Sequence, residues 1–189
     1  MSTMQPIRDL KDIERLKRYF LDRDEIRNYV LVVVGINLPI RISDLLGLKW
    51  NDVYNYRMHS YRKHLTLIEK KTGKKNVLMI NDNVSEALER LRQDSVGEDD
   101  YIFKAYPHSS EPLTRVAAYL FIKQAADELG LEDIGCHSLR KTFGYHAWKQ
   151  GTHLALIMSI YNHSSIHVTK RYLGIEQDDK DEVMKMLQL

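Results

Sequence analysis

Apolar residues recur at intervals of three and four along most of this chain, and this spacing predicts a fold built mainly from helices. In the first such segment Ile13, Leu16 and Phe20 share one face, and Asp9 stands in the position of an N-cap. Pro39 ends the second segment, since proline cannot continue a helix. The predicted helices cover residues 10–21, 24–37, 43–48, 83–93, 114–129, 138–150, 154–161, 165–172 and 179–187.

One stretch, residues 64–80, follows a different pattern. Leu65 and Leu67 alternate with polar residues, residues 71–74 have the composition of a turn, and residues 77–80 form a second β-prone run. This pattern predicts a β-hairpin. We therefore expect a mainly α (α+β) fold, a helical bundle with a small antiparallel sheet. A chain of 189 residues without repeats or flexible linkers is predicted to form a single domain over its whole length.

The sequence carries no signal for export or for a membrane span. Its longest apolar run, Tyr29–Ile36, is far shorter than the roughly 20 residues that cross a bilayer. Residues 1–6 lack the basic and apolar regions of a signal peptide. Cys136 is the single cysteine, which excludes an internal disulfide and favours a reducing compartment. We expect a cytoplasmic protein with no membrane partner.

The formal charge of +2 hides a separation of basic and acidic segments. Residues 49–75 carry eight lysines and arginines against two acids, and residues 137–172 carry five without any acid. Residues 81–100 and 176–189 have net charges of −5 and −3. A polyanion would be attracted to the two basic segments, although solvated helix faces explain most charge runs. Nucleic acid is therefore one candidate partner.

Four residues whose side chains can react or bind an anion lie within 36 positions near the C-terminus: His137, Arg140, His163 and Tyr172. Arg41 lies upstream, at the predicted entrance of a short helix. Displacing an alkoxide from a phosphodiester requires a nucleophile, donors for the non-bridging oxygens and an acid for the leaving oxygen. Arginine suits the second role because its planar fork forms two parallel hydrogen bonds to phosphate. Taken singly each residue is more often a surface or packing residue, and only the set points to phosphodiester chemistry.

The segment around Arg140 gives a further reason to expect an anion. Ser138 is predicted to cap a helix there, which would place Arg140 in the first turn, where the helix dipole favours negative charge. His137 precedes Arg140 by three residues, so both side chains can face one phosphate.

This set of residues resembles the catalytic domain of tyrosine recombinases, the phage-integrase family, over about residues 10–175. In chain order, the matching elements are the arginine box 41–50, Lys71 in the turn Lys71-Thr72-Gly73-Lys74, the HxxR box His137-Ser138-Leu139-Arg140, and His163 nine residues before Tyr172. Order, residue type and spacing agree for all six roles. Asn162 stands where the family often has glycine, and Pro39-Ile40 replaces the usual Gly-Leu, but neither change removes a reacting group.

The resemblance implies a role for each residue. Tyr172 would attack the scissile phosphate and form a 3′-phosphotyrosyl link, which conserves the bond energy so that another strand can be joined without ATP. The two arginines would bind the phosphate, and Lys71 would be the general acid for the leaving 5′ oxygen. His137 would assist proton transfer at the nucleophile, and His163 would donate to a phosphate oxygen. No metal and no other cofactor is then required.

Two further assignments concern neighbours of these residues. Lys70 and Lys74 compete with Lys71 for the role of general acid, and only the Lys-Thr-Gly pattern of the family favours Lys71. Asp44, three residues after Arg41, is expected to buttress the site rather than to react.

The resemblance also implies partners and an origin. These are double-stranded DNA, a homotetramer on DNA and accessory DNA-bending proteins, in a protein encoded by a bacterium, a phage or a mobile element. In the family the C-terminal tail docks on a neighbouring protomer. Here residues 178–189 place Val183, Met184 and Leu187 on one helical face, and docking in trans or packing in cis both remain open.

Members of the family commonly carry an N-terminal helical domain that clamps the far side of the DNA. Only about nine residues precede the first catalytic-domain helix here, so we expect this core-binding domain to be absent, either in a fragment or in a short single-domain member such as the fimbrial invertases. Two alternatives to recombination stay open: a DNA-binding regulator that cuts poorly, and supercoil relaxation of the type IB topoisomerase kind. The DNA target and the choice among integration, excision, inversion and resolution cannot be read from the sequence.

Overall fold

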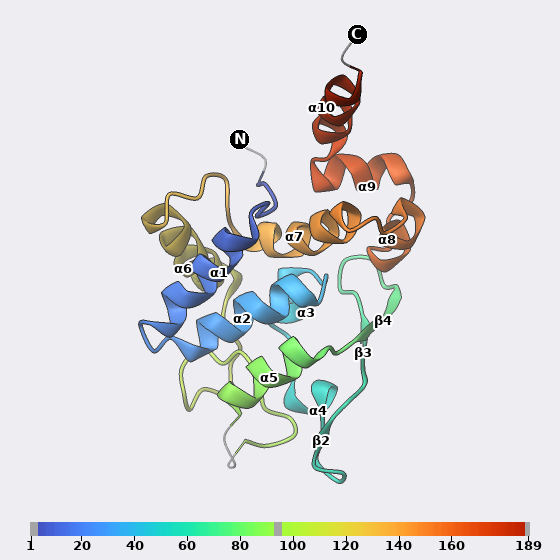
Figure 1. Cartoon of the computed structure of the whole chain (residues 1–189). Helices are drawn as coiled ribbons and strands as arrows, with labels where there is room; N and C mark the ends of the chain where they lie inside the picture. The colour runs from blue at the N-terminus through green and yellow to red at the C-terminus, as the bar shows by residue number, and fades with distance from the viewer. Residues whose placement is uncertain (1–3, 93–95, 188–189) are drawn as a thin grey trace.

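The computed structural model, which describes residues 4–92 and 96–187, is mainly helical and contains two small antiparallel hairpins (Figure 1). The helices are α1 (Leu10–Leu21), α2 (Ile26–Asn37), α3 (Ile42–Leu45), α4 (Trp50–Val53), α5 (Asp82–Leu91), α6 (Arg115–Glu128), α7 (Cys136–Lys149), α8 (Leu154–Ile160), α9 (Ile166–Leu173) and α10 (Glu176–Met186). The strands are β1 (Tyr54–Asn55), β2 (Ser60–Tyr61), β3 (His64–Ile68) and β4 (Lys75–Met79). The predicted fold class is confirmed. Among the described residues, no helix has the length and apolar character that a membrane span requires.

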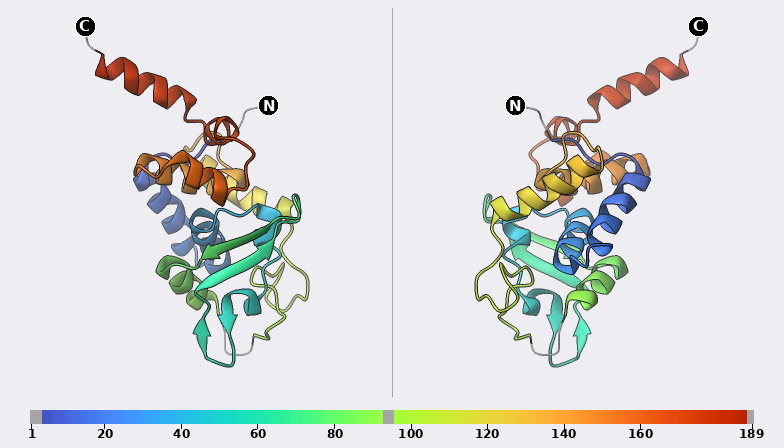
Figure 2. Two further views of the ribbon diagram at one scale, coloured as in Figure 1. Left: turned by 90° about the vertical axis from the view of Figure 1, so that its right-hand side faces the viewer. Right: turned by 90° about the vertical axis from the view of Figure 1, so that its left-hand side faces the viewer.

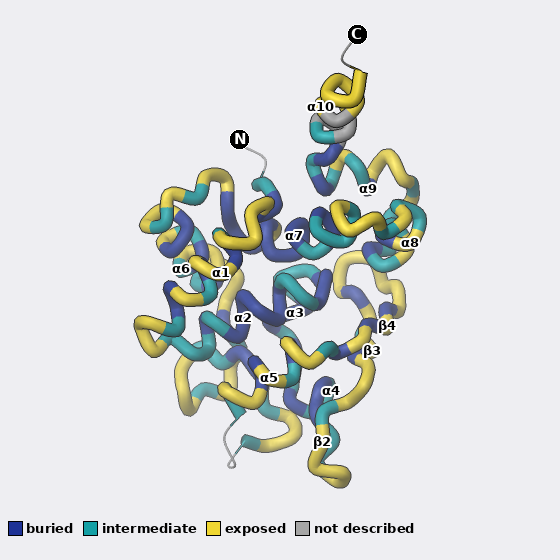
Figure 3. The backbone as a smooth tube through the Cα atoms, in the orientation of Figure 1, coloured by how far each residue is buried: buried dark blue, intermediate teal, exposed yellow. Residues whose placement is uncertain are grey.

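The main core is built around α2, which lies at the centre of the molecule (Figure 1). Residues 30–34 are all buried, because α1, α5 and α7 pack on different sides of this helix. Figure 3 shows the buried backbone concentrated in α2 and α7. A separate, smaller apolar cluster holds α7, α8 and α9 together and consists of Tyr145, Ile157, Tyr161, Leu173 and Ile175.

The predicted hairpin is formed by β3 and β4, which pair antiparallel with Leu65 opposite Leu78. Both leucines are buried, whereas the residues that alternate with them are largely exposed. Gly73 in the turn has a φ of 66°, a conformation that glycine adopts without strain. The turn lies beside α3 and the end of α8 (Figures 1 and 2), where Lys74 Nζ donates to Asn162 O at 3.4 Å.

Each of the nine predicted helices has a counterpart, with ends that agree or differ by at most three residues within the described part of the chain. Asp9 caps α1 as predicted, and its carboxylate accepts from the Lys11 N–H at 2.8 Å. The predicted helix 43–48 begins at Ile42 and ends at Leu45, and the last helix begins at Glu176. α4 and the β1–β2 hairpin escape prediction because segments of two to four residues carry no clear periodicity. Residue 93 of a predicted helix and residues 188–189 of the predicted tail lie outside the described residues.

The prediction that Ser138 caps the helix around Arg140 is wrong. α7 begins at Cys136, with Gly135 in the N-cap position. The Ser138 hydroxyl accepts from the Gly135 N–H at 3.1 Å and so satisfies the helix start from inside the first turn. Arg140 therefore lies in the second turn, and His137 takes the place in the first turn that was predicted for Arg140.

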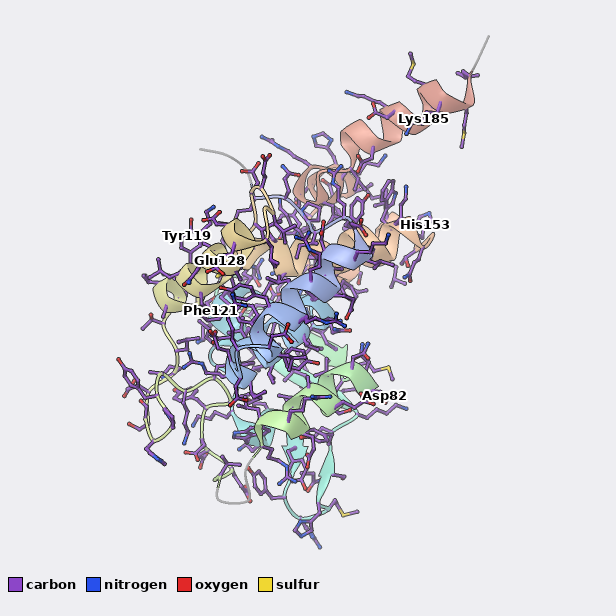
Figure 4. The ribbon with its side chains drawn as sticks, turned by 60° about the vertical axis from the view of Figure 1, so that its left-hand side comes forward. Asp82, Tyr119, Phe121, Glu128, His153 and Lys185 are labelled. Carbon is purple, nitrogen blue, oxygen red and sulfur yellow. The ribbon has the colours of Figure 1, made fainter. Side chains whose placement is uncertain are left out.

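α10 extends away from the rest of the molecule (Figures 1 and 2). Figure 4, in which Lys185 marks this helix, shows its side chains reaching into open space. Val183, Met184 and Leu187 form the predicted apolar face and are 53%, 74% and 61% exposed. These three side chains do not pack on the core of their own chain, so the structure does not have the cis arrangement.

Candidate active site

Separate segments of the chain bring four of the predicted catalytic residues together. Arg140 lies on α7, Tyr172 in the last turn of α9, and His163 in the loop between α8 and α9. The ring centroid of Tyr172 lies 5.1 Å from that of His163 and 6.0 Å from the guanidinium carbon of Arg140. Arg41, immediately before α3, is close enough for its positive charge to lower the pKa of His163, although burial is the larger cause. These side chains therefore surround one small region.

Arg140 is a buried cation with incomplete hydrogen bonding. The residue, which lies on α7, is 4% exposed, and its Nη2 donates to Tyr161 O at 3.2 Å. The guanidinium carbon lies 4.8 Å from the centroid of the Tyr161 ring. Within the described residues, Nε has no hydrogen-bond partner and no carboxylate forms a salt bridge with Arg140. Burial lowers the pKa of Arg140, which is the mark of a cation whose hydration has not been replaced.

Arg41 is held by a carboxylate that comes from the hairpin. Its Nη1 donates to Glu69 Oε2, and the two side chains form a salt bridge. Asp44 is expected to support the site. Within the described part of the chain, no hydrogen bond joins it to Arg41. Asp44 Oδ1 instead accepts from the backbone N–H of Lys70 at 3.1 Å, so its role in this arrangement is to support the hairpin turn.

The three lysines that compete for the role of general acid occupy different environments. Lys70 Nζ donates to Ser43 O at 3.1 Å, and Lys74 Nζ donates to Asn162 O at 3.4 Å. Lys71 is exposed at the turn, and its ammonium group makes no hydrogen bond or salt bridge within the described part of the chain. The two neighbours are thus engaged with backbone carbonyls, whereas Lys71 is available to a ligand.

His163 is neutral in this arrangement and is held through Nδ1. This nitrogen lies 3.1 Å from the hydroxyl oxygen of Thr169, which is itself 3.2 Å from Ser165 O. Burial, followed by the charges of Arg140 and Arg41, lowers the pKa of His163 to about 4. At pH 7 the ring is therefore neutral and carries one proton. Bound phosphate would favour the doubly protonated ring, in which both nitrogens are donors.

His137 stands at the open rim of the same region, as the second residue of α7. Loss of hydration is the largest cause that lowers the pKa of His137, and the positive charges of Arg140, Lys141 and Lys71 add to it. The influence of Lys71 indicates that the hairpin turn faces the start of α7. A neutral imidazole at this position can accept a proton from a nucleophile.

Tyr172 is a half-buried phenol without a built-in base. Burial raises the pKa of Tyr172, and the charges of Arg140 and Arg41 lower it in part. Its hydroxyl has no hydrogen bond within the residues that the structure describes. A neutral hydroxyl near Arg140, on which the charge of Arg41 also acts, is suited to attack an electrophile that brings its own negative charge.

Glu69, which the sequence analysis does not single out, lies directly against the predicted residues. Its carboxylate is buried and pairs with Arg41. A signal for it was available, because Glu69 is the single acid between Asp52 and Asp82.

Lys141 is a second buried charge, and no motif in the sequence marks it. Its Nζ donates to Met4 O at 2.7 Å and lies 5.3 Å from the centroid of the Tyr172 ring. Burial lowers the pKa of Lys141. Lys141 is adjacent to Arg140 in the sequence, and nothing in this position indicates that its side chain would bond to the N-terminal segment at Met4.

Comparison with known proteins places these features in a family. The sequence model described as the phage integrase family matches residues 9–178. The "Probable integrase/recombinase YoeC" of Bacillus subtilis is 39% identical over 178 residues, which are 94% of this chain and 93% of that protein. "Tyrosine recombinase XerC" of Roseiflexus castenholzii is 29% identical over 163 residues, and the match covers 82% of this chain but only 49% of the relative.

Solved structures show the same fold at lower identity. A XerA recombinase structure superposes with a TM-score of 0.72 at 19% identity and covers 100% of this chain and 67% of its own. A XerH site-specific recombinase structure gives 0.73 at 16% identity, with 100% and 54% covered. The family match spans most of the sequence, and the chain belongs to the phage integrase family of tyrosine recombinases.

Proposed function

We propose that this protein is a site-specific DNA recombinase that cuts and rejoins strands through a 3′-phosphotyrosine formed on Tyr172. The observation that carries the proposal is the state of Arg140 beside this phenol. Arg140 is buried, and in the described chain it has an unpartnered Nε and no salt bridge. A buried cation is costly until an anion pairs with it, and a backbone phosphate would supply that anion next to the nucleophile.

The proposed reaction needs no energy source beyond the diester itself. The Tyr172 oxygen attacks phosphorus while the bond from phosphorus to the 5′ oxygen breaks, which yields a phosphotyrosyl ester and a 5′-hydroxyl. His137 assists removal of the phenol proton, and Lys71 gives a proton to the leaving oxygen. Arg41 and Arg140 hold the non-bridging oxygens as charge develops on them. Attack by the 5′-hydroxyl of another strand reverses these steps and releases Tyr172.

Duplex DNA is the partner that the charge distribution supports. The basic segments 49–75 and 137–172 both contribute residues to the candidate site. Neighbouring solved structures include XerH bound to a palindromic difH substrate and a lambda integrase dimer bound to a COC′ core site. We propose the same kind of partner here, bound across the face that carries the hairpin turn and the start of α7.

The exposed helix α10 supports an assembly of several protomers on DNA. Val183, Met184 and Leu187 leave apolar surface on an element that projects from its own chain. Burying such side chains contributes roughly 25 cal/mol for each Å² removed from water. We propose that α10 docks on a neighbouring protomer when two duplexes are brought together.

Covalent trapping tests the proposed chemistry. The protein is incubated with nicked duplexes from the DNA that flanks its own gene, and a denaturing gel is searched for a protein–DNA adduct. We expect an adduct from the wild type and from Tyr106→Phe, an exposed surface tyrosine, and none from Tyr172→Phe, with DNA affinity within about twofold in all three. An adduct that survives in Tyr172→Phe would exclude this nucleophile. Tight binding without any adduct would favour a regulator, and relaxation of plasmid without exchanged products would favour a topoisomerase.

A further inference from the structure

Glu69 is a buried carboxylate whose hydrogen-bonding capacity is almost completely used. Its side chain is 1% exposed at the end of β3, within the most basic segment of the sequence. Oε2 accepts from Arg41 Nη1 and from Thr72 Oγ1, the latter at 2.7 Å. Oε1 accepts from the amides of Asn162 at 3.2 Å and Asn76 at 3.4 Å.

The partners of Glu69 come from the segments that carry the proposed catalytic groups. Arg41 is itself one of these groups. Thr72 follows Lys71 in the hairpin turn, and the same turn is closed by the Gly73 N–H, which donates to Glu69 O at 2.8 Å. Asn162 directly precedes His163 and has a φ of 56°, a left-handed conformation that asparagine adopts more readily than most other residues. One carboxylate therefore connects an arginine, the turn of the general acid and the loop of the second histidine.

The charge of Glu69 is maintained by these contacts. Burial alone would raise the pKa of Glu69, but the hydrogen bonds from Thr72, Arg41 and Asn162 outweigh it, and the pKa lies below its ordinary value. Glu69 is thus a carboxylate at neutral pH. Its negative charge also offsets the repulsion between Arg41 and Arg140, two cations that face one region without DNA.

The geometry excludes a direct chemical role for this carboxylate. Both oxygens are occupied, the side chain is sealed from solvent, and no hydrogen bond joins it to Tyr172 within the described residues. Arg41, by contrast, is 19% exposed at its side chain and engages Glu69 through Nη1 alone, so its remaining donors can reach a phosphate.

We propose that Glu69 is a positioning residue for strand cleavage: it holds Arg41, the Lys71 turn and the Asn162–His163 loop in their working arrangement before DNA binds. This inference rests on the proposed function. Removing the carboxylate frees the turn and releases Lys71 from its place near the leaving oxygen, and at the same time it leaves Arg41 without its fixed partner.

A change of leaving group separates positioning of the general acid from other effects. Sulfur in place of the bridging 5′ oxygen leaves as a thiolate and does not need a proton, so a variant that has lost only the general acid recovers on such a substrate. Lys71→Ala is the reference for this behaviour. Glu69→Gln keeps the size of the side chain, and Glu89→Gln, which removes a largely exposed ion-paired carboxylate on α5, is the matched control.

We expect Glu69→Gln to form adduct about 10- to 100-fold more slowly than wild type on the oxygen substrate, and to recover at least fivefold of that loss on the sulfur substrate. Glu89→Gln should match wild type on both. Cleavage by Glu69→Gln within twofold of wild type on oxygen, or an equal deficit on oxygen and sulfur, would overturn the inference. DNA affinity and thermal unfolding are measured in parallel.

Thr72→Val keeps the test decisive if Glu69→Gln does not fold. This variant leaves the salt bridge with Arg41 intact. It removes the 2.7 Å hydrogen bond from Thr72 Oγ1 to the carboxylate, and with it the longer 3.4 Å hydrogen bond that the Lys74 N–H donates to the same hydroxyl. It should show the oxygen-specific deficit, and the absence of a deficit would overturn the inference. Failure of the wild type to form adduct on either substrate, with Tyr172→Phe equally inactive, would refute the proposed function and the inference with it. Adduct from wild type together with unaffected Glu69 and Thr72 variants would refute the inference alone.

Discussion

Replacing Arg140 by methionine should stabilise the free protein while it abolishes strand cleavage. The variant removes a cation that is 4% exposed and keeps a side chain of similar length in the same space. Taking an ion out of water costs several kcal/mol in a folded protein, and about 5 kcal/mol is a reasonable value for a guanidinium buried to this degree. The single hydrogen bond to Tyr161 O offsets about 2 kcal/mol of this cost, and the contact with the Tyr161 ring about 1 kcal/mol.

The remaining penalty in the wild type is about 2 kcal/mol, because no carboxylate of the described chain pairs with Arg140 and its Nε is left unbonded. Methionine escapes that penalty. We therefore expect Arg140→Met to raise the free energy of unfolding by about 2 kcal/mol, which corresponds to a rise in Tm of about 4–8 °C for a chain of this length. Such a gain at the expense of activity is typical of residues kept for function.

Urea unfolding at pH 7, followed by circular dichroism, measures the effect with and without sulfate. Sulfate should stabilise the wild type by binding the native state and should have little effect on Arg140→Met. Arg171→Met, which removes an exposed arginine from the same chain segment, should change stability by less than about 0.5 kcal/mol. A loss of more than about 1 kcal/mol in Arg140→Met would show that Arg140 is already satisfied without a ligand, and the argument for a waiting phosphate site would fail.

Three more predictions concern the packing under Tyr172, the titration of His163 and the C-terminal helix. Gly144→Ala should lower the free energy of unfolding by about 1–3 kcal/mol and slow adduct formation, because the new Cβ would lie 2.6 Å from Leu173 Cδ2 and 2.7 Å from Tyr161 Oη; an unchanged Tm would contradict this packing. His163 should titrate near 4 in a ring-proton NMR spectrum of the free protein and at higher pH with bound DNA, whose phosphate favours the protonated ring. Since its folded pKa is below the ordinary 6.5, the unfolded chain binds more protons between these values, and the share of stability contributed by neutral His163 should be lost as pH falls from 6.5 to 4; a pH profile unchanged in His163→Gln would count against it. Deleting residues 179–189 should leave cleavage of a single nicked duplex intact but abolish pairing of two duplexes in a gel-shift assay, and unchanged pairing would exclude docking in trans.

The parts of this fold that could be predicted are those with a local cause. Asp9 precedes an apolar face at helical spacing, and Leu65 and Leu67 alternate before a turn, so α1 and the β3–β4 hairpin follow from neighbouring residues alone. The predicted start of α7 is wrong because a serine can act either as the N-cap or from within the first turn. Only the backbone position of Gly135 decides between the two.

In the candidate site, too, the features with a local cause could be predicted from the sequence, and those that depend on long-range contacts could not. The residues with reactive groups carry a recognisable order and spacing, and three of them, Arg41, Arg140 and His163, meet around Tyr172. The contacts that fix them do not, because Glu69 reaches Arg41 across 28 positions and Asn162 across 93. Lys141 likewise bonds to Met4 across 137 positions. Such pairings depend on how helices and hairpin pack, which no local pattern encodes.

The small apolar cluster of α7, α8 and α9 has a consequence for local unfolding of the protein. The helix that carries Tyr172 is anchored by Leu173 and Tyr161 in this cluster rather than in the large core around α2. A unit with so few buried residues can open and close while the rest of the molecule stays folded. Amide hydrogens of α8 and α9 should therefore exchange with solvent sooner than those of α2, and the nucleophile can be withdrawn and restored without dismantling the scaffold that holds the arginines.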